Sequence, residues 1–303
     1  MAKHVTPQME RINRKAFDRK GRRKNSSLAR ESWRRLCRNR TALLGMGIVI
    51  LLLLVAIFAD LICPYDYAAQ DYTAIAQKPS LAHPFGTDAY GRDLFSRCIY
   101  GTRYSLPIAL LAVLSSLVLG GLFGFIAGYA GGKTDNVIMR FVDVLQAIPG
   151  TLLCIAIVAV LGNSLPVLIL AMCIGALPGC AKTCRGAIMT VRTEDYVESS
   201  ISIGASNARI LVQHMIPNAV GPIIIYLVGM IGRDILMISM LSYIGVGITP
   251  PTPEWGSLLS YGKDYIQSAP YMVLFPGLMI MISVFAVNLF GDGLRDALDP
   301  RLK

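Results

Sequence analysis

Long runs of apolar residues without charge dominate the chain after residue 40. A helix needs about 20 mainly apolar residues to cross roughly 30 Å of hydrocarbon, because each residue advances it by about 1.5 Å. The pattern therefore predicts an all-α, polytopic membrane bundle with six transmembrane helices. The predicted spans are residues 41–62, 105–130, 146–161, 166–183, 219–247 and 271–290.

Turn residues separate the third and fourth spans, although no charge divides them. Residues 145–181 carry no charged side chain, and a single helix of that length would extend over roughly 55 Å, more than a bilayer accommodates. Gly162, Asn163, Ser164 and Pro166 have the turn chemistry for a reversal.

Glycines mark two further features. The run 131–134 (GGKT) imitates the end of a phosphate-binding loop, but Ala127 stands where the motif needs its first glycine, and an apolar span precedes it. The run instead predicts a tight turn between the second and third spans. The second span carries glycines that predict close packing against another helix. They are Gly120, Gly121, Gly124 and Gly128.

The distribution of Lys and Arg predicts the orientation. If the N-terminus is cytoplasmic, 23 of the 29 Lys and Arg residues fall in inside segments and 5 fall outside, while Arg233 lies within the fifth span. The positive-inside rule then favours N-in, C-in. Residues 63–104 become extracytoplasmic, and the polar loop at about 184–218 becomes cytoplasmic.

Composition agrees with a membrane location. The chain of 303 residues is 54% hydrophobic and only 16% charged, which is too apolar for a soluble globule. Residues 1–40 hold 14 Lys and Arg against three acids, so the net charge of +10 belongs to one basic arm. Attraction to anionic lipid explains this arm more simply than nucleic-acid binding does. The first span is too long for a cleaved signal peptide and is expected to remain as an anchor.

Neither a metal site nor a disulfide framework is predicted. The seven cysteines lie mostly in apolar runs, and no further ligand accompanies the pair Cys180 and Cys184. His83 stands alone on its side of the membrane, within a stretch that predicts an ordered turn and a short interfacial helix before span two. Trp255 is expected at the outer membrane interface, where indole rings favour the headgroup region.

The polar loop 184–218 reads as a helix, a break at Gly204, a second helix over 205–215 and a stop at Pro217. Its small side chains leave the backbone accessible, and its charged side chains suit a partner protein. A solvated connector is the alternative interpretation. The candidate contact residues are Glu194, Asp195, Glu198, Ser199, Ser200, Gly204, Ala205, Arg209, His214 and Pro217.

Two adjacent charges interrupt the fifth span. Arg233 and Asp234 are costly inside a membrane, so they suggest a translocation path or an ion relay. The alternative is that they point to different sides and hold neighbouring helices together.

Four blocks of the chain resemble the C-type permease subunits of dipeptide and oligopeptide ABC importers. They are HPFGTDAYGRDLFSR (83–97), GYAGGKTDNVIMRFVD (128–143), the loop from EDYVESSISIGA to HMIPN (194–218), and LSYIGVGITPPTPEWG through GDGLRDALDPRLK (241–303). Two positions depart from this pattern: Glu198-Ser199-Ser200 replaces Glu-Ala-Ala, and Ile238 stands where members often carry Glu.

The resemblance implies a five-helix permease core within 105–303, with span 41–62 as a peripheral anchor, in the plasma (inner) membrane of a prokaryote. It implies that the loop docks on an ATPase, with Glu198 facing a basic group, Gly204 allowing the bend and Pro217 ending the loop. The implied partners are a homologous second permease, two ABC ATPase subunits, an extracytoplasmic substrate-binding protein and lipid. No cofactor is expected, and ATP hydrolysis is assigned to the separate ATPases.

The sequence therefore predicts the permease subunit of an ATP-driven importer of dipeptides or oligopeptides. Nickel or another metal chelate is an alternative cargo for the same type of complex. An ion-coupled secondary carrier that uses Arg233 and Asp234 is the alternative from another class.

Overall fold

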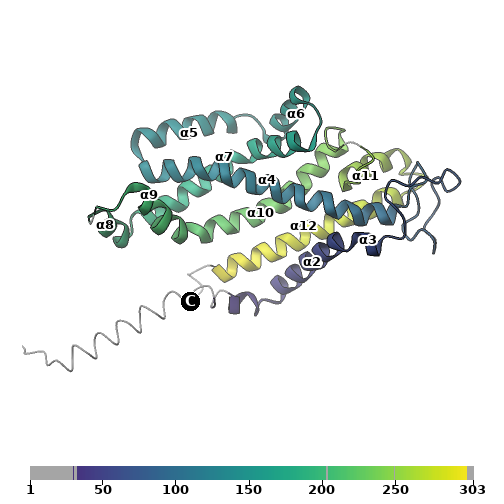
Figure 1. Ribbon diagram of the computed structural model, residues 1–303, viewed down its shortest axis with the longest axis horizontal. Coiled ribbons are helices and arrows are strands. Elements are labelled where there is room, and N and C mark those ends of the chain that lie inside the picture. Colours follow the sequence, from purple (N-terminus) through teal and green to yellow (C-terminus); the bar gives the residue numbers. More distant parts are fainter. Residues whose placement is uncertain (1–29, 31–32, 203, 249, 299–303) are drawn as a thin grey trace, which may run out of the picture.

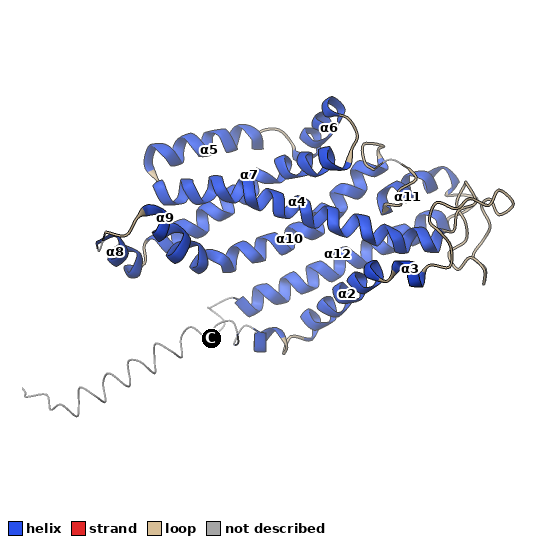
Figure 2. Ribbon diagram, viewed as in Figure 1, coloured by secondary structure: helices blue, strands red, loops and turns tan. Residues whose placement is uncertain are grey.

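The computed structural model describes residue 30 and residues 33–202, 204–248 and 250–298. The basic arm 1–40 therefore lies largely outside the described residues. The described ranges form helices and no strand (Figure 2), with one isolated bridge between Thr87 and Asp93. This confirms the all-α prediction. The elements are α2 (Arg40–Ile57), α3 (Ala59–Ile62), α4 (Leu94–Ala130), α5 (Gly132–Gln146), α6 (Gly150–Leu161), α7 (Leu165–Arg192), α8 (Asp195–Ser202), α9 (Asn207–Arg209), the π-helix η1 (Ile210–Met215), α10 (Ile216–Tyr243), α11 (Trp255–Gly262), the 3₁₀ turn η2 (Lys263–Tyr265) and α12 (Tyr271–Leu298).

The long helices lie side by side along one axis (Figure 1). α4 packs against α7, and α10 packs against α4, α7 and α12, while α2 packs on α12 at the edge of the bundle. One end of the bundle carries α8 and α9, and we call it the α8 end. The opposite end, the α11 end, carries α11 and the loop 63–93. The sites therefore lie along, or at the ends of, one helical bundle.

In the described residues, five helices are long and apolar enough to span a membrane. The pair α5 and α6, bent by 80° between them, makes a sixth candidate if it counts as one broken span. The predicted third span is thus only partly right, because 146–161 contains the 12-residue α6 and the segment before it is a helix. This helix, α5, lies almost entirely outside the predicted spans, and its Asp135 and Asp143 pair with Arg185 and Lys182 of α7.

Several helix boundaries also differ from prediction, and two of them have a clear local cause. α4 begins at Leu94, where the Oδ2 atom of Asp93 accepts a hydrogen bond of 2.7 Å from the N–H of Ser96, so no separate interfacial helix precedes span two. The prediction that Pro217 stops the helix is wrong, since a continuous helix of 37 residues runs from Asn207 to Tyr243. Pro217 lies in the first turn of α10, directly after η1. The missing N–H of Pro217 costs little helix stability in a first turn, and the wide π turn before it lets the helix continue past the proline.

Glycines bring α4 and α7 into close contact, as the sequence predicts. A Cβ atom on Gly120 would lie 3.0 Å from the Cβ of Cys180, and one on Gly128 would lie 3.0 Å from the Cβ of Ile188. A Cβ on Gly124 would lie 2.7 Å from the Cβ of Cys184. Small residues at this spacing let two backbones approach within a membrane.

α2 reaches the rest of the bundle through a similar contact. A Cβ on Gly45 would lie 2.6 Å from the backbone N of Phe290 and 2.7 Å from the O of Ala286, both in α12. The opposite face of α2 is apolar and exposed, as in Leu51 and Leu54. α2 is thus fixed along one edge by backbone proximity.

Candidate functional site

The residues of the predicted loop form a bent element at the α8 end, which we call the elbow (α8, Gly204, α9 and η1). α8 ends at Ser202, and Gly204 has φ of +78°, a left-handed conformation that glycine adopts without a steric penalty. The predicted break is therefore at Gly204. The predicted second helix, 205–215, consists of α9 followed by the π turn η1.

The elbow packs firmly onto the bundle. Val197, Ile210 and Met215 are fully buried, in one apolar cluster with Ile188 of α7. At the end of α4, the hydroxyl of Tyr129 donates a hydrogen bond of 2.8 Å to the Oδ1 of Asn207. The elbow therefore contacts α4, α7 and α10.

Most of the predicted contact residues are exposed on the elbow, and the exceptions have internal roles. Ser200 is buried and donates from its hydroxyl to the carbonyl of Tyr196 at 2.7 Å, while Ala205 and His214 are half-buried. Burial raises the pKa of Tyr196, and the charge of Glu194 adds to that effect. The exposed members are Glu194, Asp195, Glu198, Ser199, Gly204, Arg209 and Pro217.

Large apolar side chains also contribute to this surface, although none was among the predicted contact residues; Val212 of η1 is 61% exposed. Ile201 is 56% exposed in α8, three positions after Glu198. Residues three apart share a helix face, so α8 presents an acid and a large apolar side chain together. In the sequence, Ile201 stands out because serines flank it on both sides, and this pattern could have indicated an exposed apolar contact.

Arg233 and Asp234 line one cavity of about 220 Å³ between α6, α7 and α10. Asp234 is 8% exposed, and its Oδ2 atom has no hydrogen-bond partner among the described residues. The Arg233 guanidinium carbon lies 5.5 Å from the centroid of the Tyr226 ring. Both charges therefore face the same space, although they were also considered as residues pointing to different sides.

The facing wall of this cavity is made of small residues, and its remaining lining includes methionines. A Cβ on Gly175 would lie 3.2 Å from the Sγ of Cys154, and a Cβ on Gly179 would collide with the Tyr226 hydroxyl. The full lining is Gly150, Cys154, Met172, Gly175, Ala176, Gly179, Tyr226, Met230, Arg233, Asp234 and Met237. Ile238, one turn beyond Asp234, is fully buried in the core.

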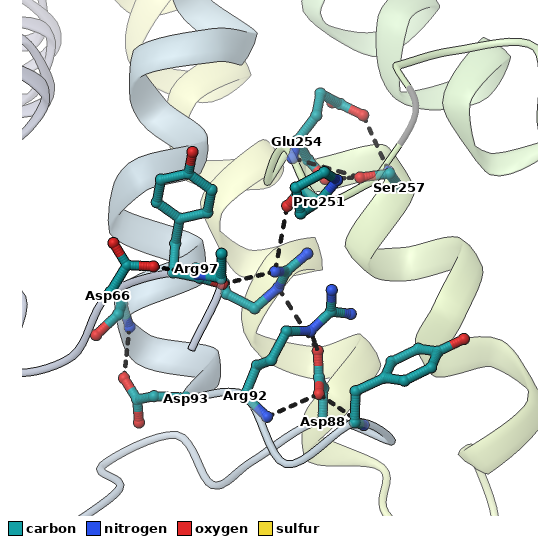
Figure 3. Close-up of polar contacts among 12 residues, drawn as sticks. Asp66, Asp88, Arg92, Asp93, Arg97, Pro251, Glu254 and Ser257 are labelled. Atoms are coloured by element: carbon teal, nitrogen blue, oxygen red, sulfur yellow. Dashed lines mark hydrogen bonds and ion pairs between the residues drawn. The ribbon is translucent and has the colours of Figure 1, made fainter. Parts of the chain in front are cut away.

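A buried polar network organises the α11 end (Figure 3). Arg97 is fully buried and donates through its NH1 group to the carbonyls of Tyr67, at 2.8 Å, and Pro251, at 3.4 Å. Asp88 accepts a hydrogen bond of 2.7 Å from the Nε of Arg92 and lies 3.6 Å from the Nε of Arg97. Arg97 thus joins the loop 63–93 to the loop that follows α10.

Trp255 is part of this end and is not at a lipid interface, so that prediction is wrong. Its side chain is fully buried, and its Nε1 donates a hydrogen bond of 3.0 Å to the carbonyl of Cys98. Gly101 makes room for the indole, since a Cβ there would lie 2.7 Å from its Cδ1. Glu254, also fully buried, caps α11 by accepting from the N–H groups of Gly256 and Ser257, both at 2.9 Å.

The described residues contain no group of three or more His, Cys, Asp and Glu side chains that could hold a metal ion. His83 instead shares a hydrogen bond of 2.9 Å between its Nδ1 and the Oδ1 of Asp93, and its ring stacks on Tyr65. This places His83 in the folded loop of the α11 end.

A helical membrane bundle, a charged cavity within it and an exposed elbow at one end define the chain as a permease of a membrane transport system. The chain belongs to the family of binding-protein-dependent transport system inner membrane components, whose model matches residues 120–303. A second family model, the N-terminal transmembrane domain of oligopeptide transport permease C, matches residues 27–79. The chain is therefore a multi-pass inner membrane protein of the ABC importer type, as the resemblance implied.

Bacterial relatives align with 90% of this chain. The dipeptide transport system permease of Alkalihalophilus pseudofirmus is 42% identical over 274 residues, covering 90% of each chain. The glutathione transport system permease of Pectobacterium atrosepticum is 41% identical over 275 residues, covering 90% of this chain and 91% of the relative. Its counterpart from Escherichia coli is 44% identical over 274 residues, covering 90% of each.

Solved structures support the fold. Two inward-facing structures of the MetNI methionine ABC transporter superpose with TM-scores of 0.57 and 0.56, at 18% and 17% identity. They cover 67% and 68% of this chain and 96% and 98% of the matched chains. The fold of the bundle is thus that of an ABC importer permease.

Proposed function

We propose that this chain is the peptide-translocating permease subunit of an ATP-driven importer and catalyses no reaction itself. Its partners would be a homologous second permease, two ABC ATPase subunits and an extracytoplasmic peptide-binding protein. Residues 105–303 would form the transporting core, with span 41–62 as an anchor beside it. The supporting observation is the elbow, which exposes acids and Ile201 while Val197 and Ile210 hold it against the bundle.

In this mechanism the elbow binds a cleft of the ATPase. Glu198 pairs with a basic group of that partner, Ile201 fills an apolar recess, and Gly204 sets the angle between the two helical pieces. Closing of the ATPases displaces the elbow, and the buried contacts convey the displacement to α7 and α10. The bundle then exchanges between two packings that open to opposite sides.

This mechanism requires the α8 end to face the cytoplasm, with both termini on that side. Single cysteines test the orientation in a variant in which the exposed Cys37 is Ser. A membrane-impermeant maleimide should label Lys78→Cys, in the loop of the α11 end, on intact cells. It should label Ser199→Cys, on α8, only after the membrane is opened.

A dipeptide and the tripeptide glutathione are the two candidate cargos. A relative with 42% identity is named for dipeptides, and relatives with 41% and 44% identity are named for glutathione. The relatives give no support to nickel, and family membership disfavours an ion-coupled carrier. Uptake of each labelled peptide into cells, with and without the binding protein, separates the cargos.

Crosslinking tests the coupling role directly. A short thiol crosslinker on Ser199→Cys should capture the ATPase subunit, whereas Lys78→Cys, exposed in the loop of the opposite, α11 end, should not. Peptide uptake should stop when the catalytic residue of the ATPase is replaced and should survive collapse of ion gradients. Capture at neither position, or uptake that depends on an ion gradient alone, would reject the proposal.

A further inference from the structure

Asp234 is a buried acceptor with one oxygen that the described part of the chain leaves unsatisfied. It is 8% exposed, lines the cavity, and its Oδ2 atom accepts no hydrogen bond from any described residue. A buried carboxylate without a donor is unfavourable by several kcal/mol. Because Asp234 lies at the cavity wall, a bound ligand can supply the missing hydrogen-bond donor.

Arg233 does not supply that donor. No ion pair within 4.0 Å joins it to Asp234 or to another described acid, and its guanidinium lies over the Tyr226 ring. Guanidinium groups bind carboxylates through paired donors. One cavity therefore holds a carboxyl oxygen without a donor and a guanidinium that contacts Tyr226 but no described acid.

The rest of the lining is neutral and adaptable. Met172, Met230 and Met237 have flexible, polarisable side chains that adjust to different shapes. Gly175 and Gly179 have no side chains, so the backbone itself forms the opposite wall there. Such a wall discriminates little between side chains, so selectivity would rest with the two charges.

From this arrangement we infer that the cavity recognises the two charged ends of a short zwitterionic peptide. Asp234 accepts hydrogen bonds from the protonated amino terminus, and Arg233 donates to the terminal carboxylate. The methionines contact the side chains without selecting among them. This inference rests on the proposed function and specifies which chemical groups of the cargo the permease itself reads.

The test measures binding to the complete permease–ATPase complex in nanodiscs, without the binding protein. Labelled Ala-Ala is displaced by unlabelled Ala-Ala, by N-acetyl-Ala-Ala, which lacks the ammonium, and by Ala-Ala amide, which lacks the carboxylate. The unmodified complex should bind Ala-Ala about tenfold or more tightly than either capped peptide, as expected for loss of a charged hydrogen bond. In Asp234→Asn the penalty for acetylation should fall to about twofold or less, while the penalty for amidation remains.

Arg233→Gln should show the reverse pattern, losing the penalty for amidation only. Met237→Leu is the matched control, because it changes the same cavity without changing charge, and both penalties should persist. Asp234→Glu keeps the carboxylate and should keep the preference for a free amino group. If Asp234→Asn fails to accumulate, the ranking of the three peptides by the unmodified complex and by Asp234→Glu still decides the question.

Equal affinity for all three peptides, no measurable binding, or uniform weakening in every charge variant would overturn the inference. ATP-dependent uptake of Ala-Ala by the complete importer is measured in parallel. If uptake occurs but the predicted binding pattern is absent, only the inference about recognition of the peptide termini is rejected. If the unmodified importer takes up no peptide, the proposed function itself is rejected.

Discussion

Arg185 holds the carboxylate of Asp135 through two hydrogen bonds of 2.5 Å, one from Nε to Oδ1 and one from NH2 to Oδ2. This fork joins α7 to α5, a helix that lies almost entirely outside the predicted spans. A paired geometry of this kind is stronger than a single contact. It makes α5 a structural part of the bundle.

We expect Asp135→Asn to destabilise the purified protein by about 1–3 kcal/mol, because the half-buried Arg185 loses its charged partner. Asp143→Asn is the matched control, since the Asp143 and Lys182 side chains are 51% and 42% exposed and such a pair contributes about 1 kcal/mol or less. Unfolding in detergent, followed by circular dichroism, measures both. Equal losses in the two variants would show that the fork has no special role.

Replacing Gly204 should separate transport from assembly. Its φ of +78° is unfavourable for a β-branched residue by about 1–2 kcal/mol or more, so Gly204→Val should bend the elbow differently. Peptide-stimulated ATPase activity should fall several-fold, while the amount of protein in the membrane changes little. Gly204→Asn should retain activity because Asn tolerates this conformation, and an inactive Asn variant would contradict the backbone explanation.

The close approach of α4 to α7 predicts intolerance of a single methyl group. In Gly124→Ala the new Cβ would meet the Cβ of Cys184 at 2.7 Å, and overpacking of this kind costs about 1–3 kcal/mol. Gly186→Ala, on α7, meets nothing within 4 Å in this chain and should be neutral or slightly stabilising. Thermal melts of the two variants in detergent should therefore shift in opposite directions or by clearly different amounts.

Glu254 should be important to the α11 end, although no cationic side chain pairs with it in the part of the chain that the structure describes. Glu254→Ala removes both acceptors at the start of α11 and the contact with Ser105, whose hydroxyl lies 3.2 Å from Oε1. Loss of a helix cap costs about 1–2 kcal/mol, and limited proteolysis within 244–270 should accelerate. Glu254→Gln keeps an acceptor and should be cut more slowly than Glu254→Ala.

Cys63 reports whether the loop 63–93 is packed against α4. Burial raises the pKa of the Cys63 thiol to about 11, so at pH 8 only about one thiol in a thousand is the reactive thiolate. Its alkylation should be slow at pH 8 and accelerate steadily up to about pH 11. Loosening the loop with Arg97→Ala should raise the rate at pH 8, and an unchanged rate would show that burial does not control this thiol.

Apolar runs located the long helices because span length and low charge are properties of the residues themselves. The glycine row of α4 was also readable, since 120, 124 and 128 repeat every four residues. α5 was misread because its acids are neutralised by α7 residues about 40 to 50 positions away, which no local pattern shows. Trp255 was misplaced for the same reason, because its partners Cys98 and Gly101 lie on another helix.

The candidate sites divide in the same way. The polarity and the glycine of the elbow marked it between two apolar spans, but only the packing of Val197 and Ile210 distinguishes a rigid element from a loose connector. Adjacent charges marked Arg233 and Asp234, while the cavity they share depends on glycines of α7. The sequence thus identified the functional residue types, whereas their burial and their shared cavity depend on contacts between helices that the sequence does not show.

The uninterrupted helix from Asn207 to Tyr243 has a mechanical consequence. Arg233 lies 26 residues beyond Asn207, or about 40 Å along the axis, and one continuous helix connects the two. Hydrogen bonds in the π turn Ile210–Met215 close over five residues instead of four, so a return to α spacing there would twist everything beyond it. A change of helical winding at η1 would therefore rotate Arg233 and Asp234 about the axis of α10 without bending the helix.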